Sequence, residues 1–485
     1  MNLLVDAWIP VIHNGQFKQI TLRELLCCEA DWQLWSHRDD MEMAALQLVI
    51  CLTQVIFMPD DLAALKRRMN TPLPEAEYDK GISGFDEMFV LDHPKHPFMQ
   101  TRGVKAKEVT PMQKLFIGLP EGNNHAFFNK TGEINRVCPS CTAIALFNQA
   151  SNCPSFGGGF KGSLRGAAPL TSLVFGETLQ TTVWRNILHR QWIHRILPAV
   201  KKQNNQAVWA AAVMAGESVY TYQIGVLRGL LWQPTHVEVI WDNALGHCEA
   251  CGFPASNLAI GFMKEKFKYE LKGVWHHPHS PRELKISKGK LKQQYSSFTS
   301  TAPVWTQLND LLISRKIKDE GHIPAPIVSQ FKEVCPFNNL SLLVGGYRIK
   351  QASILERRHE MVSLASGWAE NVDKVERFVM LALEIKEILR RKVYGFGKTV
   401  GIPGLSPAAG RLFYQNSETM IHQKLRSLNW SEAKNEFKNL HNELSNLAFQ
   451  ILEEVTLSYR YDAKMIKALA IARRTLASAL RKLTV

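Results

Sequence analysis

Toward its C-terminus the chain becomes poor in the residues that most often interrupt helices. No glycine follows Gly410, and only two prolines, Pro403 and Pro407, follow Pro336. Because proline removes a helical hydrogen bond and glycine is costly inside a helix, a stretch without them can stay helical over long distances. Turn-forming residues divide it into four segments, at 395–404, 429–431 and 459–462. We therefore predict an all-α four-helix bundle over residues 366–485.

The third and fourth of these segments carry apolar residues at helical spacing. In the third segment they recur at steps of three and four, at Ala433, Phe437, Leu440, Leu444, Leu447, Ile451 and Val455. Such a stripe is typical of a helix that buries one face. In the fourth segment the basic residues fall largely off the apolar stripe, at Lys464, Lys467, Arg474 and Arg481. We expect an exposed basic ridge that can contact nucleic acid, although a merely solvated helix face is the more common explanation.

The first 365 residues follow no single pattern. Short apolar runs such as 3–5 and 237–241 occur beside helical stretches such as 40–57, and glycine and proline are scattered throughout. With 46% apolar and 21% charged residues in 485, the chain has the composition of a packed globular protein. We predict an α+β protein, in which a large irregular mixed α/β domain over 1–365 precedes the bundle.

Basic residues outnumber acidic ones, and the excess is localised. The net charge is +14. Most of the excess lies in residues 261–292 and in the C-terminal segment 366–485. Two basic regions on a nearly neutral body favour a polyanionic partner, because each neutralised phosphate releases counterions. A solvated, solubilising surface explains the same charge about equally well.

No segment of the sequence is suited to spanning a membrane. The longest apolar stretch, 43–58, contains three polar residues and is shorter than the roughly 20 residues that a bilayer requires. The N-terminus carries an acid, Asp6, where a secretory signal has basic residues, and no small-residue cleavage site follows. We expect a cytoplasmic protein with no membrane partner.

Four of the nine cysteines form two Cys-x-x-Cys pairs, Cys138 with Cys141 and Cys248 with Cys251. Four thiolates suit a tetrahedral Zn²⁺ site with no open position, so we predict a structural zinc site that joins two distant segments. His247 could replace one thiolate, and a redox pair is the alternative, although no thioredoxin-like pattern accompanies either motif. The other cysteines are expected to be core or surface thiols; they are Cys27, Cys28, Cys51, Cys153 and Cys335.

Fragments that resemble catalytic motifs lack the residues on which the chemistry depends. Gly-Lys-Thr at 397–399 has no glycine-rich phosphate cradle before it, and His-Glu at 359–360 has no second zinc-binding histidine after it. The histidine tract 276–279 could ligate a metal, but its prolines and neighbouring lysines favour an exposed loop. A binding protein is therefore favoured over an enzyme. The alternative is a stand-alone zinc-dependent nucleic-acid-processing enzyme.

Five longer segments resemble a single protein family; they are 2–10, 97–100, 142–149, 156–161 and 345–359. They are similar to CasA, the large subunit of the type I-E CRISPR Cascade complex, and the resemblance runs nearly end to end. It implies a non-enzymatic subunit of an RNA-guided antiviral surveillance complex that reads the protospacer-adjacent motif (PAM) of duplex DNA from the minor groove. The same subunit wedges the duplex open to start the R-loop and helps to recruit a helicase-nuclease. The implied partners are the other Cascade subunits, the CRISPR guide RNA, double-stranded target DNA and the helicase-nuclease.

The resemblance also implies roles for individual residues. In this family a glycine loop, a lysine and a glutamine-bearing wedge approach the PAM. Their counterparts here are Gly157 and Gly158, Lys266, and a wedge tip of Lys350, Gln351 and Ala352. Glycines let backbone atoms come close to base edges, a lysine can donate to minor-groove acceptors, and an inserted wedge unstacks a base pair. Lys350 departs from the amide expected at its position and could gain a phosphate contact instead.

Two further roles follow from the same resemblance. Phe127 and Asn129 are similar to the family loop that engages the 5′ handle of the guide RNA, where Phe127 can stack and Asn129 can hydrogen-bond. Phe127 as a core residue is the alternative. The family's bundle lies along the displaced DNA strand and receives the helicase-nuclease. A purely architectural scaffold that reads no PAM is the third class of function.

Overall fold

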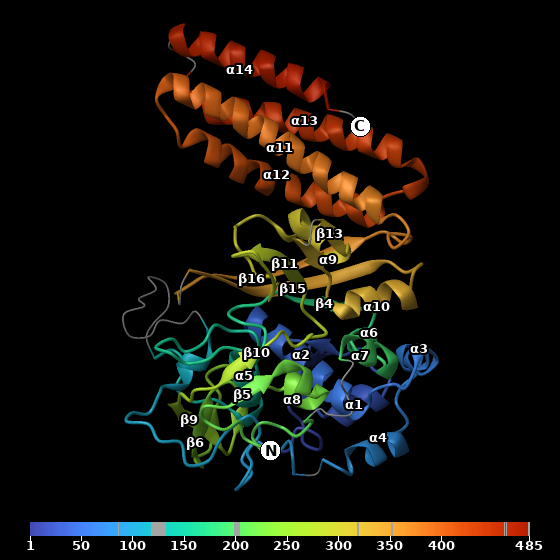
Figure 1. Ribbon diagram of the computed structural model, residues 1–485, viewed down its shortest axis with the longest axis vertical. Coiled ribbons are helices and arrows are strands. Elements are labelled where there is room, and N and C mark those ends of the chain that lie inside the picture. The colour runs from blue at the N-terminus through green and yellow to red at the C-terminus, as the bar shows by residue number, and fades with distance from the viewer. Residues whose placement is uncertain are drawn as a thin grey trace. The chain divides into compact units, whose positions relative to one another are not determined.

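The computed structural model divides the chain into two compact units (Figure 1). It describes residues 1–85, 87–117, 132–197, 204–317, 320–350, 353–459, 461 and 463–483. Unit 1 consists of Met1–Ser300, Ser314–Val334 and Leu342–His359. Unit 2 consists of Thr301–Ile313, Cys335–Ser341 and Glu360–Val485. The chain therefore leaves unit 1 and returns to it twice before it enters the long C-terminal segment.

Two buried helices form the centre of unit 1. Helix α2 (Asp39–Ile56) is buried on nearly all sides and packs against α5 (Pro139–Ser151), which is equally apolar. A helix that is hydrophobic all round is stable only when other elements surround it. Shorter helices provide part of that cover; they are α1 (Leu22–Cys27), α3 (Leu62–Asn70), α4 (Glu75–Ile82), α6 (Leu179–Arg185), α7 (Arg190–Ile196), α8 (Val226–Leu230) and α10 (Pro326–Val334).

Small sheets, rather than one large sheet, supply the β-structure. Their strand orders are β2-β1-β3, β10-β5, β12-β11-β14-β13, β16-β15-β4, β6-β9 and β7-β8. The bounds are β1 (Ile9–His13), β2 (Gln16–Ile20), β3 (Gln33–Leu34), β4 (Thr171–Val174), β5 (Ser218–Tyr220), β6 (His236–Asp242), β7 (Gly246–His247), β8 (Pro254–Ala255), β9 (Leu258–Glu265), β10 (Glu270–Lys272), β11 (Arg282–Ser287), β12 (Lys290–Tyr295), β13 (Arg315–Ile317), β14 (Glu320–Ile323), β15 (Leu340–Lys350) and β16 (Ser353–Leu364). The predicted mixed α/β character is confirmed.

The histidine tract 276–279 is buried, so the prediction of an exposed loop was wrong. His277 and His279 are 3% and 0% exposed. The ring of His279 lies 3.2 Å from the carbonyl of Asn186, and its backbone N–H donates to His277 Nδ1. The lysines that suggested exposure lie on the following hairpin, β11–β12, where they face solvent. Within the described residues, the tract is not part of any cluster that could hold a metal ion.

Lowering the pH from 7.5 to 5.0 is expected to destabilise the protein through His279. Burial lowers the pKa of His279 to about 3, although the Asn186 carbonyl opposes the shift. Unfolded histidine has a pKa near 6.5, so below that pH the unfolded chain binds a proton that the folded chain excludes. Stability is therefore lost as the pH falls below 6.5, by about 2 kcal/mol at pH 5 for this one group.

Thermal unfolding of the full chain across this pH range measures the effect. His279→Gln should flatten the dependence of the melting temperature on pH, because glutamine does not titrate. His37→Gln, which changes an exposed histidine, should leave the dependence as it is in the wild type. Equal pH profiles for the wild type and His279→Gln would show that another group causes the acid sensitivity.

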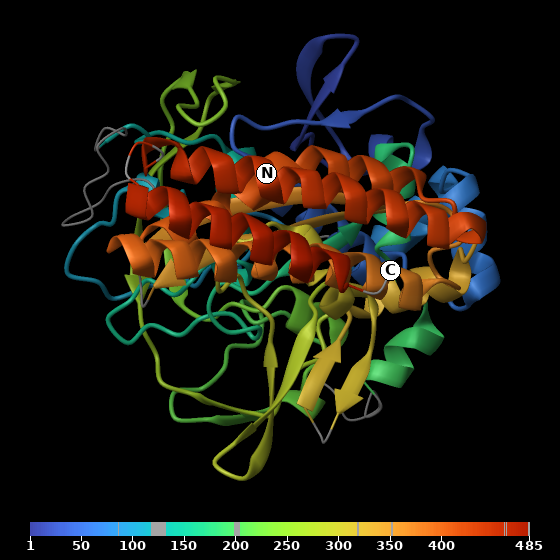
Figure 2. The same cartoon turned by 90° about the horizontal axis from the view of Figure 1, so that it is seen from above.

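Unit 2 contains the four long helices that the sequence predicts: α11 (Val372–Val400), α12 (Leu405–Ser427), α13 (Ala433–Thr456) and α14 (Ala463–Arg481). They lie side by side, and α11 packs against each of the other three (Figure 2). Their core includes Phe378, Ile385, Phe413 and Leu440, none of which is more than 1% exposed. A 3-10 helix (Val304–Gln307) and α9 (Leu308–Leu312) also belong to this unit.

The first break between the long helices falls later than the glycines suggested. Helix α11 continues through Gly395 and Gly397 and ends at Gly401, which has φ +78°. A left-handed glycine is a common helix stop. A Cβ on Gly397 would lie 2.6 Å from the carbonyl oxygen of Ile402. This glycine is therefore needed for close packing, and it does not interrupt the helix.

None of the helices in the described part of the chain combines the length and the hydrophobicity that crossing a bilayer requires.

Candidate nucleic-acid-binding site

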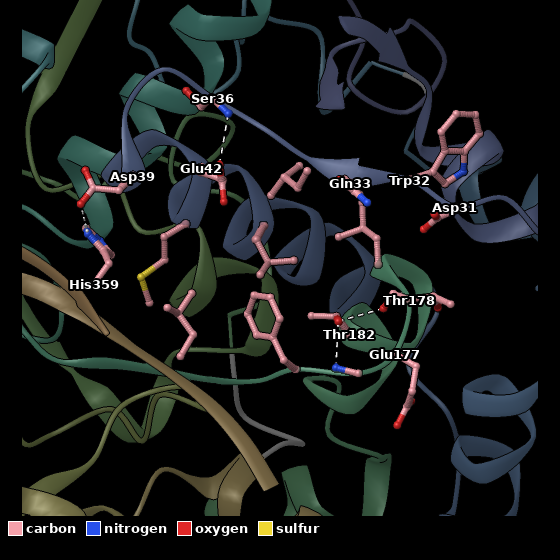
Figure 3. A pocket seen from close by; sticks show the side chains of 17 residues that line it. Asp31, Trp32, Gln33, Ser36, Asp39, Glu42, Glu177, Thr178, Thr182 and His359 are labelled. Atoms are coloured by element: carbon pink, nitrogen blue, oxygen red, sulfur yellow. Dashed lines mark hydrogen bonds and ion pairs between the residues drawn. The ribbon is translucent and has the colours of Figure 1, made fainter. Parts of the chain in front are cut away.

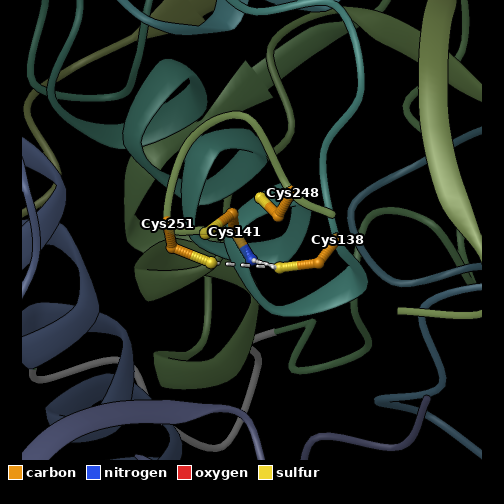
Figure 4. A group of neighbouring side chains, drawn as sticks. All are labelled: Cys138, Cys141, Cys248 and Cys251. Carbon is orange, nitrogen blue, oxygen red and sulfur yellow. Dashed lines mark hydrogen bonds between the residues drawn. The ribbon is translucent and has the colours of Figure 1, made fainter. Parts of the chain in front are cut away.

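The four predicted cysteine ligands come together in unit 1 (Figure 4). Their sulfur atoms all lie within 4.8 Å of one another, and the Sγ atoms of Cys138 and Cys251 are 3.8 Å apart. A tetrahedral zinc ion with Zn–S bonds of about 2.3 Å places its sulfur ligands roughly 3.8 Å apart. Hydrogen bonds within the cluster lower the pKa of Cys248 far below its usual value and raise the pKa values of Cys138 and Cys141 well above theirs. The spacing of the sulfur atoms is therefore the feature that fits a tetrahedral metal ion.

Local backbone geometry presents these sulfurs. Cys138 caps the N-terminus of α5, and its Sγ accepts the backbone N–H of Cys141 at 3.5 Å. Cys248 and Cys251 lie in the turn between β7 and β8, where the N–H of Gly252 closes the turn on the Cys248 carbonyl at 2.7 Å. Two backbone hydrogen bonds, of 3.0 and 2.8 Å, join Val137 to Ala259 beside the cluster. The distant segments are thus held together by main chain as well as by the thiols.

Two elements run from this cluster to the predicted PAM-reading residues. Helix α5 starts at the cysteine pair and leads through Cys153 to the glycine loop 155–159. Strand β9 starts after β8, at Leu258 next to the Ala259 that bonds Val137, and ends one residue before Lys266. At about 1.5 Å per helical residue and 3.3 Å per strand residue, these elements are roughly 20 to 26 Å long. The cluster therefore fixes the far end of both elements.

The glycine loop has a backbone shape that other residues adopt poorly. Gly157, Gly158 and Gly159 have φ values of +79°, +53° and +88°. Such angles are easily accessible only to glycine. The loop is fixed at both ends by the ring of Phe156, which contacts Phe160 at 5.7 Å and Phe262 on β9 at 5.8 Å. The loop is thus an ordered arch of bare main chain.

Lys266 lies directly against this loop. Its Nζ donates a hydrogen bond to the carbonyl oxygen of Gly158 at 2.9 Å. Two of the predicted PAM-reading elements, which are far apart in the sequence, are therefore in contact. The lysine is exposed, so its amine keeps donor capacity for a further acceptor.

A basic hollow of about 470 Å³ lies beside Lys266. Its lining includes four lysines, Lys105, Lys107, Lys264 and Lys266, and two acids, Glu108 and Glu265. One of the acids is engaged, because the Glu265 carboxylate accepts the backbone N–H of Lys105 at 3.2 Å. The excess of ammonium groups suits a polyanion. Sequence reasoning missed Lys105 and Lys107, whose only signal was two basic residues in a loop far from segment 261–292.

The remaining predicted contacts are placed only in part. Lys350 is exposed at the end of β15, whereas Gln351 and Ala352 lie outside the described residues. Phe127 and Asn129 lie outside the described residues as well. On α14, the basic ridge has Lys467, Arg474 and Arg481 exposed at intervals of seven, which places them on one helix face. The side chain of Lys464 is also outside the described part.

A second pocket, of about 460 Å³, lies between β3, the start of α2 and the segment that leads into α6 (Figure 3). Its acidic groups include Asp39, Glu42 and Glu177, and each has a partner. Asp39 pairs with His359, Glu42 accepts the N–H of Ser36, and Glu177 pairs with Arg185. These contacts hold the three carboxylates in fixed positions on the wall of the pocket.

Comparison with protein families gives a match over most of the chain. A family model described as CRISPR-associated protein Cse1 matches residues 2–451. A curated relative, the CRISPR-associated protein CasA/Cse1 of Thermus thermophilus, is 27% identical over 200 residues. That alignment covers 39% of this chain and 39% of the relative, so this chain matches less than half of the length of the relative.

Solved structures share the fold over nearly the whole chain. The crystal structure of Thermobifida fusca Cse1 has a TM-score of 0.80 at 17% identity and covers 99% of this chain and 97% of that chain. Thermus thermophilus CasA (Cse1) has a TM-score of 0.75 at 17% identity and covers 99% of each chain. A chain of a CRISPR RNA-guided surveillance complex has a TM-score of 0.69 at 14% identity and covers 98% of this chain and 99% of that one. At these identities the likeness concerns the fold.

Proposed function

The chain belongs to the CRISPR-associated protein Cse1 family, and from that premise we propose that it is the large, non-catalytic subunit of a type I-E surveillance complex. In this proposal the subunit recognises the PAM of duplex DNA from the minor groove and starts strand separation. Its partners are the other Cascade subunits, the guide RNA, the target duplex and the helicase-nuclease. The fold likeness to a chain of an RNA-guided surveillance complex supports this assignment.

The observation that carries the proposal is the contact between Lys266 and Gly158 beside the basic hollow. The minor groove displays acceptors at every base pair and is narrow, so a reader must combine small size with donor groups. A side-chain-free arch and an adjacent ammonium group meet both needs. Lys105, Lys107 and Lys264 can neutralise the phosphates that flank such a groove.

We assign the remaining residues by the same reasoning. The wedge role goes to Lys350, the last residue of β15, and to Gln351 and Ala352, which lie in the sequence between β15 and β16. Phe127 and Asn129 engage the guide-RNA handle. The cysteine cluster holds a structural zinc ion, whose four ligand positions are filled by Cys138, Cys141, Cys248 and Cys251.

Lys266→Ala in the assembled complex is expected to weaken binding to a guide-matched duplex with the preferred PAM by about tenfold. One charge-assisted hydrogen bond is worth about 1.5 kcal/mol, which corresponds to that factor. Binding to a duplex with a poor PAM should change much less. Equilibrium binding measured on both duplexes gives the ratio directly.

Lys268→Ala is the matched control, because Lys268 is an exposed lysine two residues away that does not line the hollow. If Lys266→Ala and Lys268→Ala behave alike on all PAM variants, the subunit is an architectural scaffold. If the complex cleaves the DNA in the presence of Mg²⁺ without a helicase-nuclease, the zinc-dependent enzyme becomes the better interpretation.

A further inference from the structure

Residues that flank three segments to which the proposed function gives a role meet at one small buried cluster of unit 1. Its members are Ile117, Cys153, Ala168 and Tyr347, with Ile349 and Ile354 packed against it. Ile117 is the last described residue before segment 118–131, which contains the predicted handle-binding residues. Cys153 precedes the glycine loop, and Tyr347 precedes the wedge on β15. The cluster therefore joins the described residues that precede these three segments in the sequence.

The hydroxyl of Tyr347 joins two central helices to the wedge strand. It donates to Asp40 Oδ2 on α2 at 2.9 Å and accepts from Asn148 Nδ2 on α5 at 2.9 Å. These three residues are only 1–2% exposed. One hydroxyl thus connects the strand that leads to Lys350 with the helix that leads to the glycine loop. Burial and the nearby charge of Asp40 raise the pKa of Tyr347 well above its usual value, so the hydroxyl keeps its proton.

Arg38 extends this network to the third segment. Its guanidinium binds Asp40 through two hydrogen bonds, Nε to Oδ1 at 3.0 Å and Nη2 to Oδ2 at 2.8 Å. The same Nη2 donates to the carbonyl oxygen of Ile117 at 2.6 Å. Because a buried carboxylate is costly without a partner, Arg38 and Asp40 hold each other in one geometry. Through Arg38, the same arrangement also fixes the backbone of Ile117, the last described residue before position 118.

The wedge hairpin has few other attachments near its tip. Strand β15 pairs with β4 only from Leu342 to Gly345. Beyond Gly345 it has β16 as its sheet neighbour, and a two-stranded hairpin is only marginally stable by itself. Asp39, in the first turn of α2, binds His359 Nδ1 at 2.8 Å and also pairs with Arg357, both on β16 (Figure 3). The first turn of α2 therefore holds both strands of the hairpin.

We propose that Tyr347 is a positioning residue for PAM recognition, which fixes the wedge hairpin relative to the glycine loop through Asp40 and Asn148. The inference rests on the proposed function. Apolar packing is non-directional, whereas a satisfied buried hydrogen-bond network specifies a single arrangement. A hydroxyl that contacts no DNA therefore contributes to the discrimination between PAM sequences.

Tyr347→Phe in the assembled complex tests this inference. The variant keeps the ring in the cluster and removes the two hydrogen bonds. The ratio of affinities for guide-matched duplexes with a preferred and a poor PAM is expected to fall by about tenfold, because a displaced wedge loses specific contacts and keeps non-specific ones. Melting temperatures are measured on the same samples.

Tyr78→Phe is the matched control. Tyr78 is 0% exposed in unit 1, and its hydroxyl donates to the Leu4 carbonyl oxygen at 2.7 Å. This variant should lower the melting temperature and leave the affinity ratio unchanged. If Tyr347→Phe also leaves the ratio unchanged while Lys266→Ala lowers it, the positioning role is wrong and the proposed function stands. If Lys266→Ala leaves the affinity ratio unchanged too, both the positioning role of Tyr347 and the proposed function are wrong.

Discussion

Replacing Cys248 with serine is expected to remove most of the folding stability of unit 1. Structural zinc contributes about 10–16 kcal/mol to the folding of small zinc domains, and a serine hydroxyl does not replace a thiolate ligand. The loss should exceed what an ordinary buried substitution costs, since the cluster joins the start of α5 to the turn between β7 and β8. Thermal unfolding of the purified protein measures the loss of stability, and metal analysis measures the loss of zinc.

Cys28→Ser provides the control, because Cys28 is an exposed cysteine outside the cluster. It should retain the zinc content and the melting temperature of the wild type. Incubating the wild type with a strong chelator should reproduce the loss seen in Cys248→Ser. A wild-type protein that contains no zinc after expression in zinc-supplemented medium would contradict the assignment.

Reversing three charges on α14 is expected to weaken the R-loop complex by about a hundredfold at about 0.2 M salt. The variant is Lys467→Glu, Arg474→Glu and Arg481→Glu combined, and all three residues are exposed. If each residue neutralises one phosphate of the displaced strand, the slope of log affinity against log salt should become shallower by about 2 to 3. Dissociation of the complex from target DNA, measured over a series of salt concentrations, gives both quantities.

A second triple variant distinguishes an effect of the α14 ridge from an effect of the net charge of unit 2. Arg411→Glu, Lys434→Glu and Lys438→Glu change the charge of the same unit by the same amount, on exposed residues of α12 and α13. If only the α14 variant is impaired, the ridge on α14 is a binding surface. Equal effects of both variants would mean that the overall charge of unit 2, and no particular ridge, attracts the nucleic acid.

The sequence was most informative where one local property dominates. The scarcity of proline after Pro336 and the absence of glycine after Gly410 predict the four helices, because helix formation depends on near neighbours. The spacing of the cysteines predicts the cluster, because thiolate chemistry favours a shared metal. In both cases the physical cause is contained in a short stretch of residues.

Features that depend on distant contacts could not be predicted in this way. The bond between Asp40 and Tyr347 joins positions separated by 307 residues, and no local pattern marks either residue. The buried histidines were misread for a related reason. The prolines and nearby lysines are consistent with the exposed hairpin that follows. They give no information about distant residues that contact the buried tract, such as Gln47 and Asn186 beside His279.

If the glycine arch reads the minor groove as we propose, its three consecutive left-handed glycines limit how the DNA preference of this protein can change. Any single-codon change at Gly157, Gly158 or Gly159 introduces a chiral residue, which costs about 1–2 kcal/mol at such angles even though the space around Gly157 and Gly158 is open. The arch therefore cannot readily acquire a side chain that reads bases. Under this proposal, a new target preference is reached more easily through substitution of the surrounding lysines than through the arch itself.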